Sequence, residues 1–165
     1  MREYYYLKAS LPYLTFNKAP LMSGEDFLTE GRKWMDPKDL KMLERTKLED
    51  HVIRDDETRV SFDWKIFNSE FKKEIAAARK KVPGKIPSKR VKRIMKQETP
   101  LDSEIMIEKI RWDHLEDKEL LFGFDINALI IYFLKLQIAE RLASFDKDKG
   151  ENIFYKSCEV KYGKH

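Results

Sequence analysis

The segment DKDKG at residues 146–150 places carboxylates at alternate positions, as in a calcium-binding loop. Asp146 and Asp148 could each donate an oxygen to a cation. An EF-hand loop needs glycine at its sixth position and glutamate at its twelfth, whereas Gly150 is fifth and Ser157 is twelfth here. This register excludes an EF-hand. The segment is instead predicted to end a helix, with Gly150 available for a left-handed turn.

The other side chains that could act as nucleophiles, bases or metal ligands are dispersed along the chain. His51, His114 and His165 lie far apart, and none belongs to an H-x-x-x-H or similar ligand spacing. The single cysteine, Cys158, excludes an internal disulfide and a multi-cysteine zinc site, and no motif pairs it with a base. There is no glycine-rich phosphate loop and no G-x-S-x-G. We therefore predict a protein that is not an enzyme, with no catalytic residue, metal or cofactor.

A basic run, RKKVPGKIPSKRVKRIMK at residues 79–96, is the clearest candidate for contact with phosphates. Its nine lysines and arginines would give binding that weakens steeply with salt. The candidate contacts to nucleic acid or to lipid headgroups are Lys80, Lys81, Lys89, Arg90, Lys92 and Arg93. The run has no aromatic residue for base stacking, and Val91, Ile94 and Met95 repeat like the buried side of a short helix. A nucleic-acid-binding module and a solvated connector both remain open.

The composition is that of a helix-rich globular protein. Of the 165 residues, 42% are hydrophobic and 38% are charged, with only six glycines and six prolines. This length fits a single helical domain, residues 1–165, with the basic connector at residues 79–96 inside it. The net charge of +4 is too small to imply nucleic acid by itself. The beginning of the chain lacks a secretory signal, which favours the cytoplasm.

Apolar periodicity and capping residues predict about five or six helices in a compact all-α bundle. Two helices are predicted near the beginning, one from Gly24 toward Lys33 after Ser23 and one from Pro37 with Asp36 as cap. A third has a buried face of Trp64, Phe67, Phe71, Ile75 and Ala78, and a short fourth covers residues 90–97. A fifth begins at Asp102 or Ser103 with Ile107, Ile110 and Leu115 buried, and the last runs from Ile126 onward. The beginning of the chain is undecided. Three adjacent tyrosines favour a short strand, whereas Leu7 and Leu11 fit helical spacing.

The last helix, NALIIYFLKLQIAERLASFDKDKG at residues 127–150, is not a membrane span. Its apolar part covers about thirteen residues and includes Lys135 and Gln137, whereas a span takes roughly 20 apolar residues. It is therefore predicted to pack against protein.

One side of this helix changes from apolar to polar along its length. At about 100° per residue, Ile126, Ile130 and Phe133 share a side that further on carries Glu140 and Arg141. Something must cover the apolar part and stop before the polar part. Either another helix of the chain covers it, or a partner protein does, with Glu140 and Arg141 as the polar rim of the contact.

Three stretches resemble an uncharacterised bacterial family encoded with V/A-type ATP synthase genes. They are YYYLKASLPYL at residues 4–14, EDFLTEGRKWMDPKDLKMLE at 25–44 and FDINALIIYFLKLQIAERLASFDKDKG at 124–150. The last stretch is also similar to the helices of the protein that caps the central stalk of these complexes, in which an apolar helix runs into a Glu-Arg pair. The resemblance covers the two ends of the chain, and its motifs are packing patterns rather than chemical signatures.

The resemblance implies a helical, non-enzymatic protein of an ion-transporting V/A-type ATPase. Its partners would be other subunits of that complex, and it would lie in the cytoplasm, peripheral to the membrane part. The chain is about half as long as the full stalk-cap protein, which leaves open whether it fills the whole cap or part of it. The positions that match the family's C-terminal pattern are Asn127, Tyr132, Glu140, Arg141 and Asp146. Together with Ile126, Ile130 and Phe133, they are the predicted partner contacts.

Overall fold

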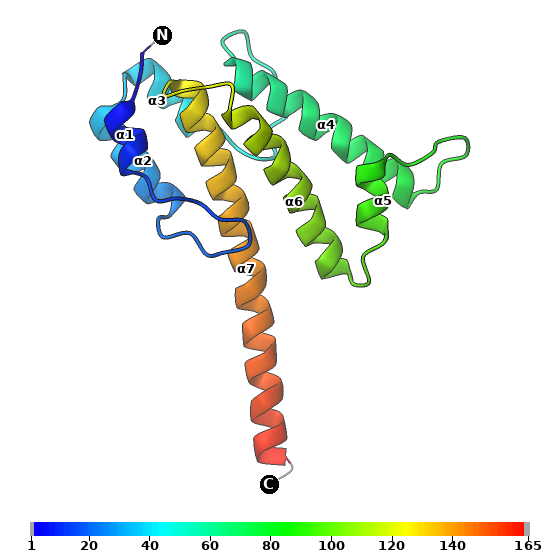
Figure 1. Ribbon diagram of the computed structural model, residues 1–165. Helices are drawn as coiled ribbons and strands as arrows, with labels where there is room; N and C mark the ends of the chain where they lie inside the picture. The colour runs from blue at the N-terminus through cyan, green and yellow to red at the C-terminus, as the bar shows by residue number, and fades with distance from the viewer. Residues whose placement is uncertain (1, 164–165) are drawn as a thin grey trace.

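The computed structural model describes residues 2–163, and describes side chains as far as residue 145. Over this part of the chain it contains seven helices and no strand, which confirms the predicted all-α fold with one or two helices more than expected. The helices are α1 (Tyr5–Ser10), α2 (Gly24–Trp34), α3 (Pro37–Glu44), α4 (Arg59–Arg79), α5 (Lys89–Met95), α6 (Pro100–Glu119) and α7 (Ile126–Gly163) (Figure 1).

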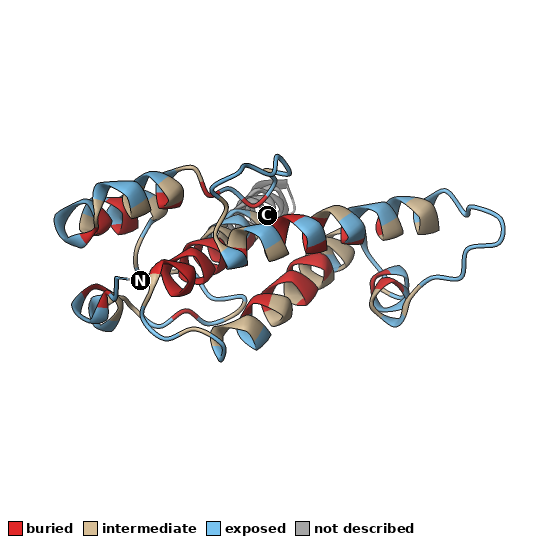
Figure 2. Ribbon diagram, turned by 90° about the horizontal axis from the view of Figure 1, so that it is seen from above, coloured by how far each residue is buried: buried red, intermediate tan, exposed pale blue. Residues whose placement is uncertain are grey.

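The first part of α7 forms the centre of the bundle. Every residue from 126 to 136 is buried, so this part is covered on all sides, as expected for a helix with an almost wholly apolar sequence. α2 and α3 pack on one side of it, and α4 and α6 pack on the other, with α5 filling the space beside α4 and α6 (Figure 1). Figure 2 shows the buried residues concentrated at this centre and the exposed ones on the outer sides of the surrounding helices.

Local capping fixes where most of the helices begin. The side chains of Ser23, Thr58, Ser88 and Thr99 each accept a hydrogen bond from the backbone N–H three residues later. Two predicted caps are wrong. Asp36 precedes α3, but its side chain makes no capping bond. α6 begins at Pro100 rather than near Asp102, because Thr99 supplies the cap and proline suits the first helical position.

The beginning of the chain, for which both a strand and a helix were possible from the sequence, is helical. Leu7 of α1 is 1% exposed, and Leu11 packs partly buried against the same core, so the helical spacing of the leucines decides the structure. Tyr4 anchors this helix, because its hydroxyl donates a 2.5 Å hydrogen bond to Asp39 and its backbone N–H donates to the carbonyl of Phe124. Burial, followed by the bond to Asp39, raises the pKa of Tyr4 to about 12.

α7 continues well beyond the predicted end at Gly150. It has 38 residues and runs to Gly163, and in Figure 1 its second part extends past the ends of the other helices. A glycine inside a helix costs about 1 kcal/mol relative to alanine, which is too little to end a helix whose other residues favour it. Within the described part of the chain, none of the helices is both long and apolar enough to cross a membrane.

Candidate functional site

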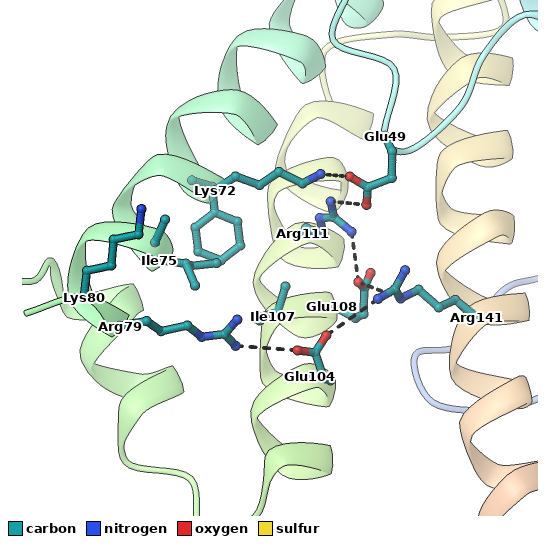
Figure 3. Close-up of a pocket in the computed structure, with 12 residues that line it drawn as sticks. Glu49, Lys72, Ile75, Arg79, Lys80, Glu104, Ile107, Glu108, Arg111 and Arg141 are labelled. Atoms are coloured by element: carbon teal, nitrogen blue, oxygen red, sulfur yellow. Dashed lines mark hydrogen bonds and ion pairs between the residues drawn. The ribbon is translucent and has the colours of Figure 1, made fainter.

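An open groove of about 650 Å³ lies between α4, α6 and α7. Its apolar surface comes from Phe71, Ile75 and Ala76 of α4 and Ile107 of α6. The charged residues that line it are Glu49, Lys72, Arg79, Lys80, Glu104, Glu108, Arg111 and Arg141 (Figure 3). Five are basic and three are acidic, which leaves an excess of two positive charges. We call this cavity the charged groove.

A buried ion pair lies at the inner side of the charged groove. Glu108 is fully buried and Arg111 is 3% exposed, and both belong to α6. The Arg111 guanidinium donates to Glu108 Oε1 at 2.9 Å, to Asn68 Oδ1 at 2.7 and 2.9 Å, and to Glu49 Oε1 at 2.8 Å. One arginine therefore connects α4, α6 and the segment after α3.

The Glu108 carboxylate is only half satisfied. Its Oε2 atom is buried and has no hydrogen-bond partner among the described residues, which is costly for a charged group. Burial raises the pKa of Glu108, although Arg111 and Arg141 act in the opposite direction. The carboxylate therefore depends on these two arginines to stay ionised in its buried position.

Ion pairs continue along the rim of the charged groove. Arg141 of α7 lies 3.4 Å from Glu108 Oε1 and 3.6 Å from Glu104 Oε2, and Arg79 of α4 lies 3.5 Å from Glu104 Oε1. At the other end, Lys72 pairs with Glu49. Lys80 has no ion pair among the described residues. Figure 3 shows the rim as a connected series of charges across three helices.

The titratable side chains of the charged groove are carboxylates, lysines and arginines. None of its twelve lining residues carries a hydroxyl, thiol or imidazole group that could serve as a nucleophile or a histidine base. Among the side chains described, no group of three or more His, Cys, Asp and Glu is arranged to hold a metal ion. An apolar surface with an excess of arginine and lysine fits an acidic segment of a protein partner.

The predicted docking surface on Ile126, Ile130 and Phe133 is wrong. These side chains are 3%, 0% and 3% exposed, because the chain's own helices cover them. Phe27 of α2 lies against Phe133, with ring centroids 5.2 Å apart. The apolar side ends where α2 begins, since the backbone N–H of Gly24 donates to Glu140 Oε1 at 3.0 Å.

The polar residues predicted as partner contacts also bind within the chain. Asn127 is buried and its Oδ1 accepts from the backbone N–H of Val60 at 3.1 Å, at the beginning of α4. The Tyr132 hydroxyl donates to the carbonyl of Pro12 at 2.7 Å, and burial raises the pKa of Tyr132 to about 12. Glu140 holds the positive end of α2. Arg141 lies in the charged groove, and the Asp146 side chain lies outside the described residues.

The basic candidates in residues 79–96 divide into two kinds. Lys80, Lys81, Lys89, Lys92 and Arg93 are exposed. Arg90 instead makes two hydrogen bonds of 2.9 and 3.0 Å to Glu74 and lies over the rings of Phe67 and Phe71. Arg90 is therefore a structural residue that fastens α5 to α4, and the remaining five stay candidates for phosphate contact.

A second buried cation, which the helical pattern of α4 did not indicate, fixes the connector before α4. Lys65 is 7% exposed, and its Nζ donates to Glu57 Oε1 at 2.6 Å and to the carbonyl of Val52 at 2.7 Å. Asp50 lies 3.5 Å from the same Nζ. The acidic connector thus folds around one lysine rather than standing in solvent.

The lowered pKa of Asp50 predicts that part of the protein's stability is lost at acidic pH. A hydrogen bond from Arg54 lowers the pKa of Asp50 to about 2, and the Val52 N–H and Lys65 add to it. Because the folded pKa is below the unfolded one, this stability is present above about pH 4 and is lost as the pH falls toward 2. Asp50→Asn should lower the free energy of unfolding by about 2 kcal/mol at neutral pH and by much less near pH 2. Urea unfolding across this range measures it. Asp55→Asn is the control, and an equal loss at both ends of the range would contradict the prediction.

A family model described as "Protein of unknown function (DUF2764)" matches residues 88–159. The match covers α5, α6 and most of α7, including Glu104, Glu108, Arg111 and Arg141 of the charged groove. No curated protein and no solved structure matches the chain. The chain is therefore similar to this family over α5, α6 and most of α7, and α6 and α7 contribute to the lining of the charged groove.

Proposed function

We propose that the protein is a non-enzymatic helical interaction subunit of a V/A-type ATP synthase or ATPase, similar in role to the protein that caps the central stalk. Its partners are other subunits of that complex, and its contact with the membrane-embedded subunits is indirect, through these partners. The sequence resemblance at the two ends of the chain supplies the class of complex. The shape of α7 supplies the observation that carries the proposal.

α7 is longer than the bundle that it organises. Its 38 residues correspond to about 57 Å at 1.5 Å per residue, and its first part alone is enclosed by the other helices (Figure 1). Helical stability in proteins comes mainly from packing, so a long helix that leaves its bundle gains most from a partner beside it. Such a helix suits a part that links two bodies of a larger assembly.

The charged groove lies beside α7 and offers an adjoining contact. Arg141 belongs to α7 and to the groove, and Arg79 and Lys80 add positive charge at the α4 side. Arg79 is about half exposed, and its pairing with Glu104 at 3.5 Å is open to exchange. An acidic side chain of a partner can therefore replace Glu104 at these arginines while apolar side chains rest on Phe71 and Ile75.

Recovery of the tagged full-length protein from its native cells at low salt tests this proposal. We expect rotary ATPase subunits to be recovered with it, and the proposal is wrong if none is. The double variant Arg79→Gln/Lys80→Gln should recover much less of these subunits, because partner carboxylates lose their counter-charges. Lys38→Gln/Lys41→Gln on α3 is the matched control, since both lysines are exposed and have no ion pair among the described residues. Equal recovery with both double variants would contradict a contact at the groove.

A further inference from the structure

The outer face of α5 is basic, and Met95, which was expected on the buried side, is 49% exposed at the edge of this face. The exposed residues of this helix and its C-terminal cap include Lys89, Lys92, Arg93 and Lys96, which fall within an arc of about 100° on a helical projection. The opposite side carries Val91 and Ile94, each 1% exposed, which pack into the core. α5 therefore has a fixed orientation that turns four positive charges toward solvent.

The loop between α4 and α5, which directly precedes this helix, carries exposed apolar side chains. Ile86 is 86% exposed, and Val82 is 36% exposed. α4 ends in a left-handed turn at Lys81, with bonds from the N–H of Lys81 to Ala78 and of Val82 to Ala77, and Gly84 also has a positive φ of 80°. Residues 80–88 thus leave the bundle as a defined loop, which projects from it in Figures 1 and 2.

No acidic residue interrupts the segment that carries this surface. From Arg79 to Gln97 the chain contains nine basic residues and no Asp or Glu. Two of the nine are neutralised by carboxylates from elsewhere, Arg79 by Glu104 and Arg90 by Glu74. The other seven have no ion pair among the described residues. Lys80 lines the charged groove. We call the other six of these residues, together with Val82 and Ile86, the basic loop surface.

We propose that the basic loop surface docks on an anionic lipid bilayer, with Ile86 entering the interface between headgroups and acyl chains. Lysines and arginines at such a surface are attracted to acidic headgroups, and an exposed apolar side chain among them gains by burial in the interface. A nucleic acid offers the same phosphates, but the surface has no aromatic side chain for its bases and nucleic acid offers no apolar layer for Ile86. The partner here is a lipid surface, which goes beyond the protein partners proposed above.

Cosedimentation of the full-length protein with vesicles tests the electrostatic part. We expect binding to vesicles of phosphatidylcholine with phosphatidylserine, much less to phosphatidylcholine alone, and loss of binding at high salt. The quadruple variant Lys89→Gln/Lys92→Gln/Arg93→Gln/Lys96→Gln should lower partitioning by about six hundredfold, since each of the four charges contributes about fivefold. The matched control Lys18→Gln/Lys38→Gln/Lys41→Gln/Lys47→Gln removes the same charge from exposed residues elsewhere and should retain binding. Equal loss in both variants would overturn the proposal.

A fluorescent probe at position 86 distinguishes binding to a bilayer from binding to other polyanions. Ile86→Cys in a Cys158→Ser background, labelled with an environment-sensitive dye, should shift its emission to the blue with phosphatidylserine vesicles. Leu21→Cys, at a side chain that is 89% exposed outside the surface, should not shift. If duplex DNA competes fully with the vesicles and the dye at Ile86 does not respond, the surface binds nucleic acid and the bilayer proposal is overturned. Recovery of ATPase subunits is a separate measurement, so either proposal can fail alone.

Discussion

Arg111→Met is expected to lower the free energy of unfolding by about 4 kcal/mol. The substitution keeps the apolar stem but removes the guanidinium that contacts Glu108, Asn68 and Glu49. Glu108 would then be a fully buried carboxylate that has lost its best partner and already has one unsatisfied oxygen. Urea unfolding followed by circular dichroism near pH 7 measures the loss.

The pH dependence of the Arg111→Met variant separates charge from packing. Burial already raises the pKa of Glu108, and removal of Arg111 should raise it further. For an acid whose folded pKa is raised, stability increases as the pH falls through the folded pKa toward the unfolded value near 4.3, so the variant should recover part of its loss near pH 5. Equal losses near pH 5 and pH 7 would show that Arg111 acts through packing alone.

The double variant Glu108→Leu/Arg111→Met is the control for this pair. A buried ion pair can often be replaced by apolar side chains of similar volume at little cost, whereas removal of one partner leaves an uncompensated charge. We therefore expect the double variant to be more stable than Arg111→Met alone and to lie within about 2 kcal/mol of the native protein. A double variant less stable than the single one would contradict this account of the pair.

The helices could be predicted from apolar spacing because burial and periodicity agree in most of them. In α4, Trp64, Phe67, Phe71 and Ile75 repeat at three and four residues, and all four are buried. Helix ends were harder to predict. Thr99 and Asp102 are both acceptable caps, and the choice between them depends on how α5 and α6 connect. The C-terminal end of α7 could not be predicted, because no residue between Gly150 and Gly163 forces a break in the helix.

The charged groove could not be predicted in the same way, because its residues come from distant segments. Glu49, Lys72, Glu104 and Arg141 are separated by more than twenty residues from one another, and each alone is typical of a solvated position. One signal was present within α6. Arg111 lies between Ile107 and Leu115 in a row at intervals of four, so it occupies a position on the predicted buried side. A charged residue in such a row must find a buried partner.

The apolar side of α7 needed a cover, and the chain itself provides it. α2 covers the end of this side at Phe133 and begins at Gly24 beside Glu140, and this explains why the side becomes polar there. The surfaces that we propose for partners are therefore different ones: the second part of α7, the charged groove and the basic loop surface. They lie on α4 to α7, whereas α1 to α3 complete the core.

Phe27→Ala is expected to lower the free energy of unfolding by about 4 kcal/mol, because it opens a cavity between α2 and α7. Phe27 is fully buried, with its ring centroid 5.3 Å from that of Tyr132 and 5.2 Å from that of Phe133. The loss should be greatest where α2 meets α7, so amide hydrogens of α2 and α3 should exchange faster relative to those of α4 and α6.

Leu21→Ala is the matched control for Phe27→Ala, since Leu21 precedes α2 and is 89% exposed. It should change the stability by no more than about 0.5 kcal/mol. Hydrogen exchange with mass spectrometry measures both variants, and binding of a hydrophobic dye reports whether Phe133 becomes accessible. If Phe27→Ala speeds exchange uniformly in all helices, then α2 does not open separately from the core. The cover over the apolar side of α7 would then be an inseparable part of a single cooperative unit, contrary to this prediction.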